Sequence, residues 1–391
     1  MVLTHPFRCP TQVVEGPDCD KALAELIGGR SWALVTSQFW TDGDVPDRLA
    51  GACGEPAVRI GGVEANPSCS AVIALAEDFP PGEVVVALGG GSVMDAAKGI
   101  VALTGINGDV ATLMAHLREG RPLPDDLEPV PIIAVPTTSG SGSEVTQWGT
   151  IWGDDGIKFS VSDPRLRPGH AVHDPALCAS MPAELTLASG LDALSHAIES
   201  VWNRHHSPVT DALATTAIGV VRNNLKAALD QPGDVELRRR MQTAALISGL
   251  TMGTTQTALA HSISYQFTSR FGVPHGLACS FSLAECARYN AADDPERLKP
   301  IAAGLGCALD AVPQSLEDWF DELGLGAALS RYVTPAHADR LDDALITRAR
   351  AANNIREVDG PAARQIAARA LRRLCPVATD DRRPARGVAA R

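Results

Sequence analysis

Residues 83–100, EVVVALGGGSVMDAAKGI, decide the fold, because a short apolar run passes through a glycine turn into a helical pattern. A valine-rich run of this length is typical of a strand buried inside a parallel sheet. The glycines at 89–91 let the backbone approach a ligand, and we expect Ser92 to cap the helix. The free N–H groups of such a helix end suit a pyrophosphate. A tight turn with no ligand is the alternative.

A second stretch, IAVPTTSGSGSEVTQWGT at 133–150, repeats the pattern, since a strand runs into hydroxyls and glycines and a further strand follows. The usual dinucleotide fingerprint G-x-G-x-x-G is absent, and VTSQFWTDGD stands in its place. Two hydroxyl- and glycine-rich strand ends nevertheless suit a dinucleotide crevice at the carboxyl edge of a parallel sheet. The side chains that can donate to phosphate or ribose are Thr137, Thr138, Ser139, Ser141 and Ser143.

Across the first ~160 residues, short apolar runs alternate with helical patterns, as is typical of βαβ units. Strands are predicted within 31–37, 57–63, 83–90 and 129–138, and helices within 66–79 and 92–103. From residue 181 the pattern is almost wholly helical. We therefore predict an α/β Rossmann-like domain over 1–165, an all-helical domain over 166–378 and a flexible tail over 379–391. The alternative boundary lies near Asp174–Pro175.

Composition narrows the classes of function. The net charge of −12 disfavours a nucleic acid partner, because an acidic chain repels a phosphate backbone. No apolar run reaches the roughly 20 residues of a membrane helix. The N-terminal sequence lacks the pattern of a signal peptide, and nine cysteines occur without a C-x-x-C pair. We expect a cytoplasmic protein with reduced, mostly structural thiols and no membrane partner.

Four side chains of the helical half form a candidate metal site. Asp192 and His196 stand four residues apart in GLDALSHAIES, so both point from one face of a helix. His261 and His275 lie fourteen residues apart in a second apolar segment. One carboxylate and three imidazoles can hold a divalent ion and leave a position open for a substrate oxygen. Each histidine taken singly could instead be a hydrogen-bonded core residue.

Other polar residues are interpreted as structural. His205 and His206 are adjacent and diverge on a helix, so we place them at the surface or at a helix end. His170 and His173 are given the same interpretation, as residues that flank a turn. Asp95 and Lys98 could form a plain surface ion pair.

At these motifs the chain resembles the iron-containing (group III) alcohol dehydrogenase family. The resemblance runs from about residue 10 to about 370 and rests on GGGSVMDAAK, PTTSGSGSEVT, GLDALSHAIE and the two histidines that end in PHG. It implies the dehydroquinate synthase-like fold, a homodimer or larger assembly, and Fe²⁺ or Zn²⁺ held by Asp192, His196, His261 and His275. The nucleotide, NADH or NADPH, is then expected along Asn66, Gly91, Ser92, Val93, Met94, Asp95, Thr137, Thr138, Thr150 and Lys158.

Two positions depart from the family pattern. Many members carry an aspartate at the end of the second strand, where this chain has Ser37. A neutral hydroxyl there should tolerate the 2′-phosphate of NADPH. Four residues after His261, many members carry a histidine that relays the proton, and this chain has Tyr265. Its ordinary pKa of about 10 favours a role as an acid or a hydrogen-bonding guide.

HSISYQFTSRFGVPHG and ESVWNRHHSPVTDALA resemble the branch of the family that reduces phosphonoacetaldehyde. A dianionic phosphonate needs cationic or amide donors, and Arg270 is the first candidate. Lys158 also lies near the right segments, and Asn203 and Arg204 are further candidates. Each of the four could equally be an ordinary surface or helix-end residue.

The resemblance implies an oxidoreductase that moves a hydride between a nicotinamide and a small aldehyde or primary alcohol. The expected reaction is the reduction of phosphonoacetaldehyde to 2-hydroxyethylphosphonate. One alternative is a general short-chain alcohol dehydrogenase or aldehyde reductase. The other is a dehydroquinate-synthase-like lyase on the same fold, which would need more lysines and arginines than the two lysines found between residue 89 and residue 200.

Overall fold

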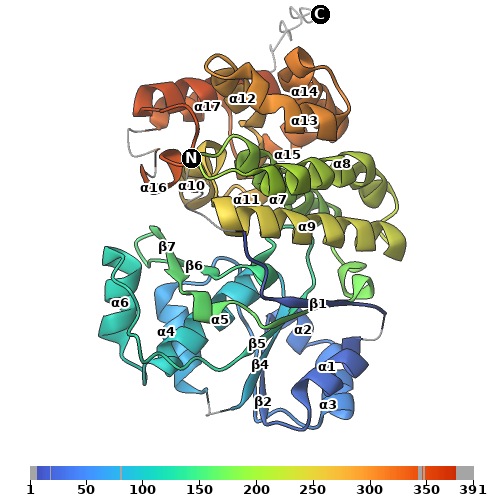
Figure 1. Cartoon of the computed structure of the whole chain (residues 1–391), viewed down its shortest axis with the longest axis vertical. Helices are drawn as coiled ribbons and strands as arrows, with labels where there is room; N and C mark the ends of the chain where they lie inside the picture. Colours follow the sequence, from blue (N-terminus) through green and yellow to red (C-terminus); the bar gives the residue numbers. More distant parts are fainter. Residues whose placement is uncertain (1–6, 18, 80–81, 342–345, 347, 376–391) are drawn as a thin grey trace, which may run out of the picture.

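The computed structural model describes residues 7–17, 19–79, 82–341, 346 and 348–375. Figure 1 shows two parts, a sheet flanked by helices and, above it in this view, a group of helices. The expected fold class, an α/β Rossmann-like part followed by an all-helical part, is confirmed.

Six parallel strands form the main sheet, in the order β1-β8-β5-β4-β2-β3. The strands are β1 (Gln12–Glu15), β2 (Trp32–Thr36), β3 (Val58–Ile60), β4 (Val84–Gly89), β5 (Ile132–Pro136) and β8 (His170–His173). The four strands predicted from sequence are β2, β3, β4 and β5. β1 and β8 were not predicted, because each is only four residues long and neither forms a continuous apolar run.

Helices cover both faces of this sheet. They are α1 (Cys19–Ile27), α2 (Gln38–Thr41), α3 (Val45–Cys53), α4 (Cys69–Glu77), α5 (Gly91–Gly105) and α6 (Val110–Glu119). Alternate residues of β4 face opposite layers: Val85 and Ala87 pack toward α4, α5 and α6, whereas Val86 and Leu88 pack toward α1 and α3. Because both faces of β4 are buried, its sequence is an unbroken apolar run.

A separate antiparallel pair, β6 (Trp148–Trp152) and β7 (Lys158–Ser162), packs against α5. β6 is the further strand predicted after the hydroxyl-rich stretch. Together with β7 it closes one side of the α5 N-terminus, where the candidate ligand loops lie.

The helical part is built around α7, which packs against α8, α9 and α11. Every residue of α7 from Thr186 to Val201 is buried, as expected for a helix at the centre of a large core. The helices are α7 (Ala183–Val201), α8 (Pro208–Asp230), α9 (Val235–Thr255), α10 (Leu259–Phe271), α11 (His275–Ser280), α12 (Leu283–Ala291), α13 (Lys299–Leu305), α14 (Val312–Glu322), α15 (Leu325–Leu329), α16 (Arg348–Ala351) and α17 (Gly360–Leu374).

A domain boundary between residues 165 and 166 would assign β8 to the helical domain, although β8 lies between β1 and β5 in the main sheet. We therefore propose that the α/β part runs to about Asp174, the alternative boundary, and that the helical part begins with α7. The expected end of the helical domain at 378 and the expected tail at 379–391 lie outside the described residues.

β8 also corrects the interpretation of two histidines. His170 and His173 lie in this strand rather than beside a turn, and His173 is buried with its Nε2 3.5 Å from Glu144 Oε1. A histidine at each end of β8, together with the turn residues Gly169 and Pro175 nearby, conceals this four-residue strand at the sequence level. His205 and His206 do follow the end of α7, as expected.

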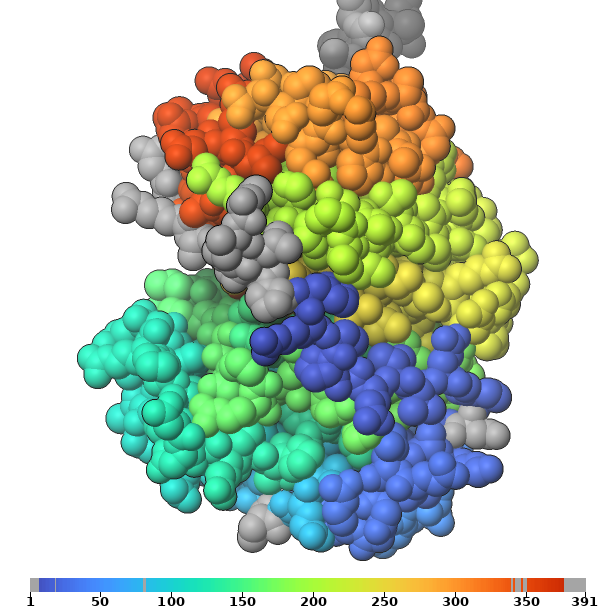
Figure 2. Space-filling model, viewed as in Figure 1, coloured from blue at the N-terminus to red at the C-terminus, as the bar shows by residue number. Residues whose placement is uncertain are grey.

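The two parts of the molecule are in contact along their boundary. In the space-filling view, blue N-terminal residues lie against yellow and yellow-green residues of the helical part (Figure 2). One such contact joins Glu15 of β1 to Arg239 of α9, with 3.3 Å between Oε1 and Nη1. In the described part of the chain, no helix combines the length and apolar character needed to cross a membrane.

Candidate active site

The glycine turn after β4 brings backbone to the floor of a cleft. Gly90, in an extended conformation, precedes the first turn of α5, so Ser92 is not the cap that we expected but lies inside that turn. Its Oγ accepts a hydrogen bond from the backbone N–H of Asn66 at 3.2 Å. A Cβ on Gly91 would lie 2.7 Å from Ser141 Oγ, so only glycine lets the two predicted loops approach this closely.

Asp95 and Lys98 tie these loops together and are not a surface pair. Lys98 is fully buried, and its ammonium donates to the Ser143 carbonyl at 2.7 Å and to Ser143 Oγ at 2.6 Å. Ser143 Oγ in turn donates to Asp95 at 2.7 Å. Burial lowers the pKa of Lys98 to about 8 and raises the pKa of Asp95. The pair was misassigned because the loop that covers it lies 45 residues further along the chain.

A cleft of about 640 Å³ extends from these loops to the helical part, a volume usual for a small-molecule site. The residues predicted to bind the nucleotide that line it are Ser37, Asn66, Gly91, Ser92, Val93, Asp95, Thr138, Thr150 and Lys158. Met94 and Thr137 do not line it. Met94 is a residue of α5 that is buried in the core, and Thr137 Oγ1 accepts a hydrogen bond from Trp40 Nε1 at 3.2 Å.

Three helices carry the four predicted metal ligands to the other end of the cleft. Asp192 and His196 come from α7, His261 from α10 and His275 from α11. The Nε2 atoms of His196, His261 and His275 lie 3.8, 3.7 and 4.0 Å from Asp192 Oδ1. Ligands of one ion lie about 3–4 Å apart, since each is about 2.0–2.2 Å from the metal. The spacing therefore fits a divalent ion among these atoms.

Close packing holds His275 against Asp192. Gly276 follows His275, and a Cβ at this position would lie 1.8 Å from the carbonyl oxygen of Ala188 on α7. Only glycine lets α11 lie this close to α7, which explains the glycine of the PHG motif.

Unpartnered polar atoms support the same assignment. Asp192 Oδ1 and His261 Nε2 are buried and make no hydrogen bond within the described residues. Leaving such atoms unsatisfied costs about 1–3 kcal/mol each, and an ion between them would remove that cost. Burial opposes ionisation of Asp192, but the three imidazoles keep its pKa below the ordinary value. Burial also lowers the pKa of His196 to about 4, which keeps this ring neutral and able to bind a metal.

Sequence reasoning missed Glu199, which orients His261. Its carboxylate is fully buried and accepts hydrogen bonds from the backbone N–H groups of Ala258 and His261 at 3.1 and 3.2 Å. Its Oε2 also lies 2.5 Å from His261 Nδ1. A carboxylate on the second nitrogen leaves Nε2 free for an ion, as is usual around metal-bound histidines. The sequence signal for Glu199 was an acidic residue within the largely apolar segment that forms α7.

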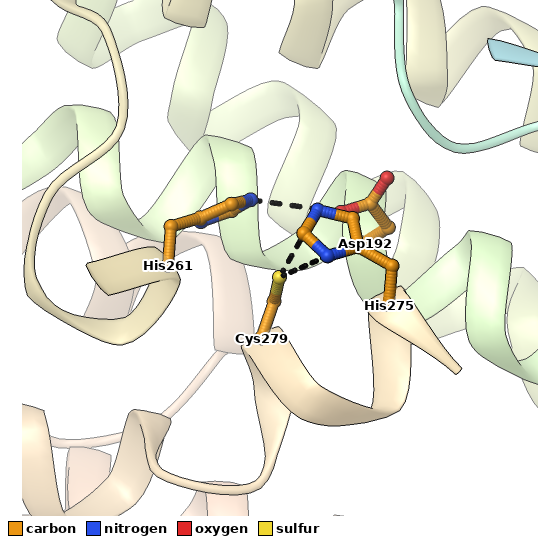
Figure 3. A group of neighbouring side chains, drawn as sticks. All are labelled: Asp192, His261, His275 and Cys279. Atoms are coloured by element: carbon orange, nitrogen blue, oxygen red, sulfur yellow. Dashed lines mark hydrogen bonds and ion pairs between the residues drawn. The ribbon is translucent and has the colours of Figure 1, made fainter. Parts of the chain in front are cut away.

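A second missed residue is Cys279, one helical turn after His275. Its Sγ belongs to a compact group with Asp192, His261 and His275, whose ligand atoms all lie within 4.8 Å of one another. Figure 3 shows the thiol directed toward the His275 ring. The i, i+4 spacing in HGLAC was the signal, and the general interpretation of the cysteines as structural concealed it.

Of the cationic side chains near the ligands, Lys158 was expected and Arg350 was not. Lys158 lies over the ring of Tyr265, with Nζ 4.3 Å from the ring centre, and Arg350 also lines the cleft. Burial alone would raise the pKa of Tyr265, but Lys158 and Arg350 lower it below the ordinary value. Tyr265 therefore ionises more readily than an ordinary tyrosine, and it lines the same cleft as the four predicted ligands.

Of the four residues proposed for a distal anionic group, Lys158 lines the cleft and the other three lie elsewhere. Arg270 is exposed at the end of α10 and does not line the cleft. Asn203 is buried and donates to the Gln256 carbonyl, and Arg204 donates to the Asn354 carbonyl. Arg270 lies in the last turn of α10, nine residues after His261, and is exposed, whereas Arg350 reaches the cleft from α16, far along the chain.

Comparison with known proteins gives a consistent result. Residues 10–175 match the family model "Iron-containing alcohol dehydrogenase", and residues 186–371 match "Fe-containing alcohol dehydrogenase family, C-terminal". The chain is 33% identical to 1,3-propanediol dehydrogenase of Citrobacter freundii over 302 residues, 74% of this chain and 76% of that protein. It is 34% identical to phosphonoacetaldehyde reductase of Streptomyces viridochromogenes over 295 residues, 73% and 71% of the two chains.

A solved structure extends the likeness to the whole fold. Sulfoacetaldehyde reductase from Bifidobacterium kashiwanohense, in complex with NAD⁺, superposes with a TM-score of 0.83 and 29% identity. The match covers 93% of this chain and 97% of that one.

Proposed function

The chain belongs to the iron-containing alcohol dehydrogenase family, and we propose that it reduces phosphonoacetaldehyde to 2-hydroxyethylphosphonate. Its class is established: it is an NAD(P)-dependent alcohol dehydrogenase that acts on small aldehydes and alcohols, with iron and a nicotinamide nucleotide as cofactors. The proposal concerns the substrate and the residues that act on it.

We assign the ion to Asp192, His196, His261 and His275 and the nucleotide to the glycine turn and hydroxyl-rich loop. When bound, the nucleotide supplies the hydride and the ion polarises the aldehyde oxygen. The chain orients the reactants, because the two loops lie at one end of the cleft and the ligands at the other. Effective orientation of this kind supplies a large part of the rate enhancement of many enzymes.

Tyr265 is proposed to hold the proton that the product alcohol requires. It lies one turn after His261 on α10, and it lines the same cleft as the four ligands. Lys158 and Arg350 lower the pKa of its phenol, so Oη is a better proton donor here than an ordinary tyrosine.

The observation that carries the substrate assignment is the pair Lys158 and Arg350. Among the described residues, no other lysine or arginine side chain lines the cleft. Both are half-buried, and both act on the phenol of Tyr265 near the ligands. A compact dianion two bonds from the carbonyl carbon would lie between these cations while its aldehyde oxygen faces the ion. The likeness to phosphonoacetaldehyde reductase supports the same substrate.

The test compares kcat/KM for phosphonoacetaldehyde, sulfoacetaldehyde and propionaldehyde in the wild type and in Arg350→Ala. Charge-assisted hydrogen bonds contribute about 1.5–3 kcal/mol each, so Arg350→Ala should reduce phosphonoacetaldehyde turnover about ten- to a hundredfold. Propionaldehyde turnover should change little. Arg270→Ala is the matched control and should affect the two substrates equally.

A wild-type enzyme that prefers propionaldehyde would refute the phosphonate assignment and favour the second candidate, a general short-chain aldehyde reductase. The likeness to 1,3-propanediol dehydrogenase favours that candidate. A preference for sulfoacetaldehyde would retain the anion site and change the substrate. The lyase alternative, which would consume no net NAD(P)H, does not agree with the dehydrogenase class that the family match establishes.

A further inference from the structure

Cys279 is the nucleophilic side chain that the proposed function leaves unused. It is fully buried on α11, and its Sγ lies 3.6 and 3.5 Å from the two ring nitrogens of His275. A buried cysteine is often a small apolar core residue. This thiol instead faces the imidazole and carboxylate groups of the ion site (Figure 3).

Two independent observations point to a ligand at this thiol. Its Sγ shares a group of four donor atoms with Asp192, His261 and His275, and no two of these atoms are more than 4.8 Å apart. Within this group, Asp192 Oδ1 and His261 Nε2 are buried and without a hydrogen-bond partner. Three of the four donors, Asp192, His261 and His275, are ligands already assigned to the ion. The fourth donor is the sulfur of Cys279.

His196 lies on another side of Asp192. Its ring stacks on His261 with 4.7 Å between centres, and it stands outside the compact four-atom group. The chain thus offers two sets of four donors that share three members and differ in whether His196 or Cys279 is the fourth.

We propose that Cys279 is a thiolate ligand of the catalytic ion, which makes this a site with one sulfur, two or three nitrogens and one carboxylate. Binding exchanges the thiol proton for the divalent ion: the S–H bond breaks, an S–metal bond forms, and the proton leaves to solvent. A sulfur ligand favours zinc and cobalt over iron relative to an all-nitrogen-and-oxygen site. The inference rests on the ion site of the proposed function and is independent of its substrate.

The direct test is spectroscopic and needs no substrate. The full-length protein is stripped of metal and loaded with Co²⁺, and its absorption spectrum is recorded. A cobalt–thiolate bond gives an intense sulfur-to-cobalt charge-transfer band in the near ultraviolet. We expect this band in the wild type and its loss in Cys279→Ser with cobalt still bound.

Two variants separate the thiol ligand from other causes. Cys286→Ser removes another fully buried thiol, on α12, whose Sγ lies 3.8 Å from Ser282 Oγ and which does not belong to the compact four-atom group. It should keep the band. His196→Ala removes one of the four assigned ligands and should bind cobalt more weakly, but the cobalt that remains bound should keep the band, because the compact group does not include His196.

Metal selection provides a second readout. When apoprotein is offered equal Zn²⁺ and Fe²⁺ under reducing, anaerobic conditions, the bound Zn:Fe ratio should fall about tenfold or more in Cys279→Ser, because the substitution removes the sulfur ligand that favours zinc. Cobalt-loaded wild type without the charge-transfer band would overturn the proposal, even if Cys279→Ser fails to fold. An unchanged band or metal ratio in a folded Cys279→Ser would overturn it too. Since neither measurement uses an aldehyde, failure of the substrate assignment leaves both outcomes interpretable.

Discussion

Glu199 controls the ion site through one nitrogen of His261, and its charge can be removed with almost no change of volume. In Glu199→Gln, the amide presents a poorer acceptor to His261 Nδ1 and to the backbone at Ala258. We expect metal affinity to fall about 10–100-fold, the range for lost partners of metal-bound histidines. Competition with a chromophoric chelator measures the affinity. Glu184→Gln, on the exposed first turn of the same helix, is the control, and equal affinities in both variants would contradict the role of Glu199.

Ser37 is a second residue at which a single charge should matter, because an added carboxylate there should change the preference between NADPH and NADH. It follows β2 and lines the cleft, where the family pattern often has an aspartate. Ser37→Asp should move the ratio of kcat/KM for NADPH to that for NADH at least about tenfold toward NADH, because about 1.4 kcal/mol of repulsion against the 2′-phosphate suffices. Ser37→Asn, which adds bulk without charge, should leave the ratio near that of the wild type. An identical shift in both variants would mean that size and not charge selects the nucleotide.

At the scale of elements, the contact between α7 and α11 sets the ligand geometry. Gly276→Ala would drive a methyl group into the Ala188 carbonyl, so the short helix carrying His275 must move away from Asp192. We expect a loss of about 1–3 kcal/mol or more in the free energy of unfolding, together with loss of bound metal. Gly253→Ala on α9, where the nearest atom to the new methyl is 3.7 Å away, should fold normally and keep its metal. Urea denaturation and metal analysis decide between these outcomes.

For the whole molecule, the proposed ligands all come from helices of the helical part, while the sheet has its own two cores. Chelation, or His261→Ala, should therefore abolish turnover and leave the fold intact. Ligand present at 100 times its Kd stabilises by about 2.7 kcal/mol, so the melting temperature should fall by several degrees. Circular dichroism and calorimetry measure both quantities. Complete unfolding on chelation would show that the ion is structural, and turnover without it would remove the proposed site.

The expected homodimer or larger assembly also belongs to this scale and stays a prediction, which light scattering of the purified protein would test.

Local patterns in the sequence determined the elements that bear the chemistry. β4 and α5 follow from an apolar run, three glycines and a helical period, all within eighteen residues. The placement of Asp192 and His196 on one face follows from helical geometry alone. These features were predictable because each depends on neighbours within one or two turns.

Tertiary structure alone decided which polar side chains meet. Glu199 orients His261 from 62 residues away, and Lys98 is buried by a serine 45 residues further on. Arg350, and not Arg270, enters the cleft because α10 turns Arg270 outward while α16 returns to the site. Periodicity records which face of an element is buried, but not which distant element covers it. Burial, and with it the charge and function of these side chains, is therefore a property of the packed molecule.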